Sequence, residues 1–232
     1  MSDSGPVYCS GPMFSDADKG QQALIAAELE AAGYETYLPQ RDGLEVGKLM
    51  RTINSPLMMA TAGTELMLKL RQAVFALDIY QLLDRCPSLV FDMDGRVPDE
   101  GSVVETAAAF AAGKPIVIFK TTPITILDGT DNPMVTGLSS SWQYVGAVKD
   151  IPGALDKAIA ATAALGPYTY APPPHVAKVI ETGAEVWKVL CDLRSKHRAA
   201  AFEDIVRDLA GWADEHHGLR GLLDHARRLV TG

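Results

Sequence analysis

Short apolar runs alternate with longer amphipathic segments over the first 166 residues. In the longer segments apolar residues recur at helical spacing, whereas the short runs are almost continuously apolar, which is typical of strands buried on both faces of a parallel sheet. Strands are predicted over residues 7–10, 34–38, 88–92, 115–119 and 142–145, and helices over residues 16–32, 48–85 in two pieces, 102–112 and 152–165. This alternation predicts an α/β fold with a doubly wound (flavodoxin-like) parallel five-stranded sheet.

Turn and cap residues punctuate this pattern. Ser15 is a good N-cap for the first helix, and residues 39–47 are expected to form a polar loop. Pro167 and the run Pro172–Pro174 mark a linker. Beyond the linker, helical spacing predicts three more helices, over residues 176–196, 199–213 and 219–229. We therefore expect a main domain over residues 1–166, a Pro-rich linker over 167–174 and a C-terminal helical tail over 175–232.

The charge lies in the main domain. Residues 167–232 hold nine Lys or Arg and nine Asp or Glu, so the whole net charge of −8 belongs to residues 1–166. An acidic surface argues against binding a nucleic acid polymer, which needs a basic face. No apolar stretch is long enough to span a membrane, and the N-terminus has no secretory pattern. Three widely spaced cysteines fit a reduced, cytoplasmic setting.

Histidine is absent from the first 174 residues, because all five histidines lie in the tail. The main domain therefore cannot use a Ser-His pair, a Cys-His pair or a histidine-bound metal. Carboxylates and tyrosines remain as chemical groups. We expect no metal and no organic cofactor.

The segment from Asp99 to Glu105 is the most informative stretch of the chain. It places Glu105 in the first turn of a predicted helix and Asp99 in the loop before it. The helix dipole favours an ionised carboxylate there, and an ionised Glu is a plausible nucleophile. A second carboxyl group with a different pKa could handle protons. The plainer alternatives are a helix-dipole carboxylate without chemistry at Glu105 and a turn residue at Asp99.

Other polar residues should meet this segment at the carboxyl edge of the sheet, where open α/β sheets bind ligands. They are the turn after the first strand with Tyr8, Gly11 and Phe14, the helix residue Asp78, and the segment 131–134 with Asn132 and Met134. Each has a plain structural alternative: strand core for Tyr8, a solvated face for Asp78, a turn for Asn132, and packing for Phe14 and Met134.

These pieces together resemble the nucleoside 2-deoxyribosyltransferase family. The opening Tyr8…Gly11-Pro12…Phe14, the string Asp99-x-Gly101-x-x-x-Glu105, the following Gly113-Lys114-Pro115 and the pair Asn132-x-Met134 look like the family's motifs in the family's order. The resemblance covers about residues 6–165, which would be the catalytic domain.

The resemblance implies a role for each matched residue. Glu105 would be the nucleophile, Asp78 and Asp99 would hold the nucleobase and exchange its proton, and Tyr8 would orient Glu105. The expected substrate-binding residues are Gly11, Phe14, Ser102, Asn132 and Met134. Asn132 would reach the site of a neighbouring protomer, so a homo-oligomer with a shared site is expected.

The implied reaction moves a 2-deoxyribosyl group between nucleobases through a covalent glycosyl-Glu intermediate. Similar proteins that cleave nucleoside monophosphates look to have Ser where this chain has Asp99 and Asn132, so a free nucleoside and a free nucleobase are the expected small-molecule partners. One alternative is an N-glycoside hydrolase on the same scaffold, in which water attacks the intermediate. A second alternative is a non-catalytic nucleotide-sensing module.

Overall fold

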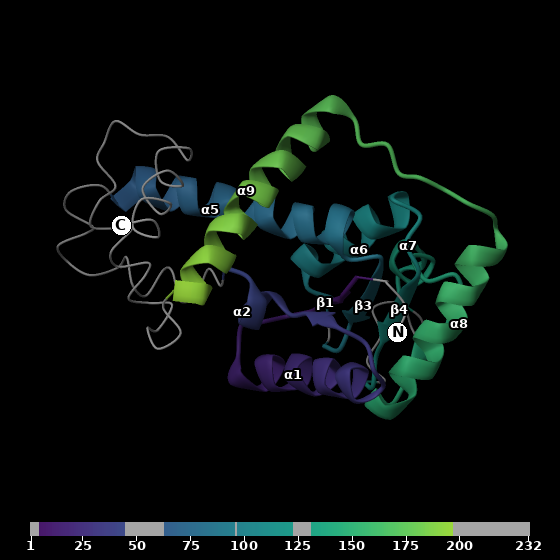
Figure 1. The fold of residues 1–232 in the computed structure, drawn as a ribbon. Coiled ribbons are helices and arrows are strands. Elements are labelled where there is room, and N and C mark those ends of the chain that lie inside the picture. The colour runs from purple at the N-terminus through teal and green to yellow at the C-terminus, as the bar shows by residue number, and fades with distance from the viewer. Residues whose placement is uncertain (1–4, 45–62, 96, 123–130, 197–232) are drawn as a thin grey trace. The chain divides into compact units, whose positions relative to one another are not determined.

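A five-stranded parallel sheet forms the centre of the main unit (Figure 1). The computed structural model describes residues 5–44, 63–95, 97–122 and 131–196. The strands are β1 (Val7–Ser10), β2 (Thr36–Tyr37), β3 (Ser88–Asp92), β4 (Ile116–Phe119) and β5 (Tyr144–Val145). Their order is β2-β1-β3-β4-β5, and every pair is parallel. The predicted doubly wound, flavodoxin-like fold is confirmed, and its order reverses between β1 and β3.

The edge strand β2 is shorter than predicted because the preceding helix uses part of its sequence. The N–H of Tyr34 still donates to the carbonyl of Leu29 at the end of that helix, at 3.0 Å. The predicted polar loop at residues 39–47 is wrong at its start, since Pro39–Asp42 forms the short helix α2. There the carboxylate of Asp42 accepts from the N–H of Leu38 at 2.9 Å and closes the turn.

Two helices cover one face of the sheet and one covers the other. Helices α1 (Asp16–Ala31) and α8 (Ile151–Ala164) lie on the first face, and α6 (Glu100–Ala111) packs on β1, β3 and β4 from the second (Figure 1). Ser15 caps α1 as predicted, because its hydroxyl accepts from the N–H of Asp18.

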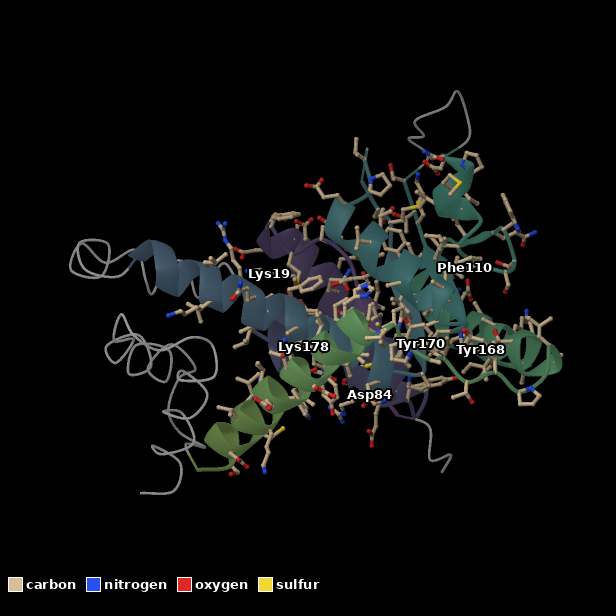
Figure 2. The ribbon with its side chains drawn as sticks, turned by 90° about the horizontal axis from the view of Figure 1, so that it is seen from above. Lys19, Asp84, Phe110, Tyr168, Tyr170 and Lys178 are labelled. Carbon is tan, nitrogen blue, oxygen red and sulfur yellow. The ribbon has the colours of Figure 1, made fainter. Side chains whose placement is uncertain are left out.

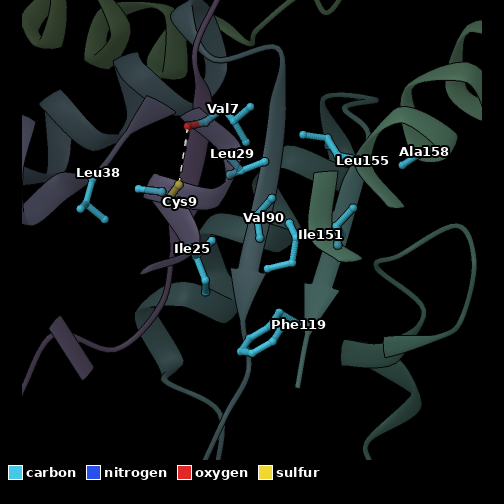
Figure 3. Packing of buried hydrophobic residues seen from close by; sticks show 12 residues of the cluster. Val7, Cys9, Ile25, Leu29, Leu38, Val90, Phe119, Ile151, Leu155 and Ala158 are labelled. Atoms are coloured by element: carbon cyan, nitrogen blue, oxygen red, sulfur yellow. Dashed lines mark hydrogen bonds between the residues drawn. The ribbon is translucent and has the colours of Figure 1, made fainter. Parts of the chain in front are cut away.

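Alternation along β1 decides which side chains meet which helices. Val7 and Cys9 point into a buried apolar cluster with Ile25 and Leu29 of α1 and Leu155 of α8 (Figure 3). Each fully buried aliphatic side chain of this kind contributes about 1.5–3 kcal/mol. Because side chains alternate along a strand, the residues between these positions face α6.

A second unit contains the two long helices α5 (Gly63–Tyr80) and α9 (Pro174–Lys196). The first unit comprises residues 1–42 and 81–172, and the second comprises residues 43–80 and 173–232. The helices approach closely at Gly183, where a β-carbon would lie 2.0 Å from the carbonyl oxygen of Ala76. The grouping differs from the predicted division, which placed α5 in the main domain, because α5 buries Leu77 against α9.

The described residues include only some of the other helices that the sequence predicts. A π-helical turn, η1 (Gln81–Arg85), continues α5 towards β3. The expected piece before residue 63 and the two expected tail helices after residue 196 lie outside the described residues. In the part of the chain that is described, no helix is both long enough and apolar enough to cross a membrane.

The turn between α6 and β4 depends on Gly113. Its φ is +72°, and a β-carbon there would lie 2.7 Å from Cδ1 of Tyr168, which is labelled in Figure 2. Gly113→Ala should lower the free energy of unfolding by about 1–3 kcal/mol, because it adds left-handed strain and displaces the ring. Denaturant unfolding measures this change.

Gly20→Ala is the matched control. Gly20 lies inside α1 with nothing within 4 Å of its missing β-carbon. The free energy of unfolding of this variant should be about 0.5–1 kcal/mol higher than that of the unchanged protein, because Ala has a higher helix propensity than Gly. Equal effects at the two glycines would contradict the structural account of Gly113.

Candidate active site

The candidate site lies at the carboxyl ends of β1 and β3, where the strand order of the sheet reverses. Open α/β sheets bind ligands at such a point. Asp99 begins α6 as its N-cap, with an extended backbone and a carboxylate that accepts from the N–H and the hydroxyl of Ser102, each at 2.7 Å. This cap fixes the start of α6 and therefore the position of Glu105 one and a half turns later.

Two hydroxyls from β1 hold the carboxylate of Glu105. The hydroxyl of Tyr8 donates to Oε1 at 2.9 Å, and that of Ser10 donates to Oε2 at 2.6 Å. Tyr8 and Ser10 are both fully buried. Because they are two residues apart on the strand, their side chains point to the same face of the sheet, the face that α6 covers. The expected hydrogen bond between Tyr8 and Glu105 is therefore present.

The electrostatics of Glu105 differ from the sequence-based expectation. Helix α6 begins at Glu100, so Glu105 lies in the second turn, where the helix dipole has little effect. Burial raises the pKa of Glu105 above its usual value, the negative charge of Asp99 adds to the rise, and the hydroxyls of Ser10 and Tyr8 oppose it. Hydroxyls, rather than the helix terminus, favour the ionised form of this carboxylate.

The other expected substrate-binding residues differ in exposure. Ser102 is buried with its hydroxyl bonded to Asp99, while Phe14 and Met134 are 85% and 79% exposed. Gly11 directly follows β1, and a β-carbon there would lie 1.8 Å from Nε2 of Gln22 and 2.9 Å from Cβ of Asp92. Gly11 is therefore required by the packing of Gln22 beneath the turn.

The segment that carries Asn132 is anchored by a buried ion pair. Lys120, directly after β4, lies 2.7 Å from the carboxylate of Asp131, and both side chains are almost inaccessible. Asn132 is exposed and caps the short helix α7 (Pro133–Thr136), since its side-chain oxygen accepts from the N–H of Met134 at 3.0 Å. The pair thus fixes the chain directly beside Asn132.

Asp78 lies near the end of α5 and belongs to the second unit. Glu105 and Asp99 belong to the first unit. The structure therefore brings together Tyr8, Ser10, Asp99 and Glu105, and the role of Asp78 stays a prediction.

Sequence reasoning missed two groups at this edge. Ser10 could have been found from the strand alternation that pairs it with Tyr8. Asp92, the last residue of β3, is buried on the other face of the sheet, where it accepts from Nε2 of Gln22 and from the N–H of Asp94, each at 3.0 Å. Burial, with the nearby charge of Asp94, raises the pKa of Asp92 to about 6.

Among the described residues, no three His, Cys, Asp or Glu side chains come together in a way that could hold a metal ion. The geometry offers instead a held carboxylate, a second carboxylate close to it and exposed apolar side chains. Such a set can attack an electrophilic carbon and exchange protons.

Comparison with known proteins agrees with the resemblance in the motifs. A family model described as Nucleoside 2-deoxyribosyltransferase matches residues 7–138, more than half of the chain. The chain belongs to the nucleoside 2-deoxyribosyltransferase family. This is a pentosyltransferase family that acts on small nucleosides, and the matched region contains every expected site residue.

A solved structure is also similar to this family member. It is a conserved protein from Enterococcus faecalis V583, with 21% sequence identity and a TM-score of 0.45, and the match covers 66% of this chain and 98% of that chain. No curated protein matches the chain.

Asp92 makes stability depend on pH. Its pKa in the folded state, about 6, lies above the ordinary value of 3.8, so the folded protein holds a proton that the unfolded chain has lost between about pH 4 and pH 6. The free energy of unfolding should therefore fall by about 2 kcal/mol through this carboxyl as pH rises across that window.

Asp92→Asn removes this titration. Its free energy of unfolding relative to that of the unchanged protein should rise by about 2 kcal/mol between pH 4 and pH 7. Urea unfolding of both proteins at the two pH values isolates the effect, since other groups cancel. A difference that stays constant with pH would contradict the raised pKa.

Proposed function

We propose that this protein transfers a 2-deoxyribosyl group between nucleobases through an ester on Glu105. The observation that carries the proposal is the carboxylate of Glu105, held at both oxygens by Tyr8 and Ser10 and lying near Asp99 at the edge of the sheet where its order reverses. A carboxylate held in one orientation is a prepared nucleophile.

In the first step a carboxylate oxygen of Glu105 attacks C1′ of the nucleoside. The C1′–N bond breaks, and its electron pair leaves with the nucleobase. Positive charge develops on the sugar, and the negative charge of Glu105 stabilises it. The departing base takes a proton from a neighbouring carboxyl group, for which Asp99 and Asp78 are the candidates.

In the second step another nucleobase attacks C1′ from the side that the first base has left. The C1′–O bond of the ester breaks, its electron pair returns to Glu105, and the incoming base loses its proton to the acidic group. Two displacements retain the configuration at C1′. If water takes the place of the second base, the same scaffold is an N-glycoside hydrolase, which is the alternative function.

We further propose free nucleosides as substrates and a site shared between copies of the chain. Asp99 occupies the start of α6, where its carboxyl group accepts from the N–H and the hydroxyl of Ser102 and so takes up donors that a substrate phosphate would need. Phe14 and Met134 are large apolar side chains left exposed in the described structure, and a second copy could cover them. A cytoplasmic setting remains part of the same prediction.

The nucleophile is tested by trapping the intermediate. After brief exposure to a 2′-deoxynucleoside and rapid quenching in acid, mass spectrometry should find a deoxyribosyl adduct on the peptide that contains Glu105. Glu105→Gln should show no adduct and should lose about 10⁴-fold or more in the rate of base release, because it removes the attacking charge.

The matched control is Glu100→Gln. Glu100 is an exposed acidic residue of the same helix, so this variant should keep the adduct and the rate. Adding a second free base separates the two functions. A transferase converts the adduct into a new nucleoside, whereas a hydrolase releases free deoxyribose at a rate that does not depend on the added base. Full activity in Glu105→Gln would falsify the proposal and favour a non-catalytic or different site.

The shared site predicts recovery of activity on mixing. Glu105→Gln and Asn132→Ala should each be inactive alone. When equal amounts are unfolded and refolded together, about a quarter of randomly assembled sites would contain neither substitution. Activity near that fraction supports a site between protomers, and no recovery from a well-formed mixed oligomer contradicts it.

A further inference from the structure

Both oxygens of Glu105 accept a hydrogen bond from the same strand. Ser10 contacts Oε2 at 2.6 Å and Tyr8 contacts Oε1 at 2.9 Å. A carboxylate with a single bonded oxygen can rotate about its Cγ–Cδ bond, but one held at both oxygens is fixed in plane. Each oxygen keeps further lone-pair directions for a ligand, since a carboxylate has about four acceptor sites in all.

The two donors differ in chemistry as well as in place. Ser10 is the last residue of β1 and donates through a short side chain that is 1% exposed, so its hydroxyl has little room to turn to another partner. The hydroxyl of Tyr8 reaches Glu105 from two residues earlier, and its ring lies 5.4 Å from that of Tyr37. The shorter hydrogen bond is the one that the sequence did not predict.

We propose that Ser10 is a positioning residue that speeds the departure of Glu105, whereas its orientation of Glu105 and its stabilisation of the attacking charge act in opposite directions on the attack. This inference rests on the proposed ester mechanism. A hydroxyl that donates to a carboxylate stabilises its negative charge. That charge is partly lost when Glu105 attacks C1′, and it is restored when the ester breaks. Through its effect on charge the hydrogen bond opposes the first step and favours the second, and in the first step the orientation of Glu105 offsets part of this cost.

The balance of bonds makes the expectation specific. In the first step a Glu105 oxygen forms a bond to C1′ as the C1′–N bond breaks. In the second step the incoming nitrogen or water forms a bond to C1′, the C1′–O bond breaks, and the electron pair returns to the carboxylate. Ser10 transfers no proton in either step. It strengthens its hydrogen bond as negative charge returns to Glu105.

Ser10→Ala should therefore change the partition of the reaction rather than abolish it. Discharge of the adduct should slow by about tenfold to a hundredfold, the effect expected for one hydrogen bond to a charged group. Formation should slow by much less, or become faster, so the adduct accumulates in the steady state. Rapid-quench mass spectrometry measures both rates from one time course.

A pH profile gives a second readout that a merely structural role would not move. The hydroxyl of Ser10 lowers the pKa of Glu105 by stabilising its charged form. In Ser10→Ala the pKa of Glu105 rises, and the acidic limb of the rate of adduct formation should move to higher pH.

Two variants control for loss of a buried serine. Ser88→Ala removes a buried serine from the neighbouring strand β3 and should leave both rates and the pH profile unchanged. Ser10→Cys replaces the hydroxyl with a weak donor of similar size and should give an intermediate discharge rate. It also serves as the test if Ser10→Ala does not fold.

The outcomes separate this inference from the proposed function. An adduct in the unchanged protein with normal discharge in Ser10→Ala, or in Ser10→Cys if that is the folded variant, overturns the role of Ser10 and leaves the ester mechanism standing. The absence of any adduct in the unchanged protein overturns the mechanism and this inference with it. Slow discharge with a shifted pH profile supports both.

Discussion

The burial of one carboxylate against the end of a strand is the interaction on which the candidate site depends. Burial raises the pKa of Glu105 and disfavours its charge, while the hydroxyls of Tyr8 and Ser10 stabilise that charge. These hydroxyls reach Glu105 because β1 packs on α6 and turns alternate side chains towards that helix. The parallel sheet is therefore a direct part of the site's electrostatics.

Loops at the same edge of the sheet are tied together by other carboxylates. Asp94 accepts from the backbone N–H groups of Thr121 and Thr122 at 2.7 and 2.8 Å, which joins the chain after β3 to the chain after β4. The buried pair of Lys120 and Asp131 then holds the start of the segment that carries Asn132. Such pairs contribute little net stability but fix a geometry, because breaking one leaves a buried charge.

The opposite face of the sheet has a different chemical character. Asp92 and Gln22 form a buried polar contact beneath the turn at Gly11, among residues that otherwise pack through apolar side chains. The carboxyl groups of Asp92 and Glu105, both with raised pKa values, therefore lie at the same edge of the sheet, one on each face. Of these two, Glu105 is the one whose carboxylate accepts from two hydroxyls, which is why we propose the chemistry there.

The sequence alone determined the five strands and the longer helices in their order, the cap at Ser15, the family and the pairing of Tyr8 with Glu105, because local patterns and spaced motifs carry that information. The tertiary structure decided what they could not. It showed that Ser10 completes the hold on Glu105, that burial rather than a helix terminus sets its pKa, and that α5 associates with α9. Each of these depends on contacts between residues far apart in the chain, and periodicity within a segment does not encode such contacts.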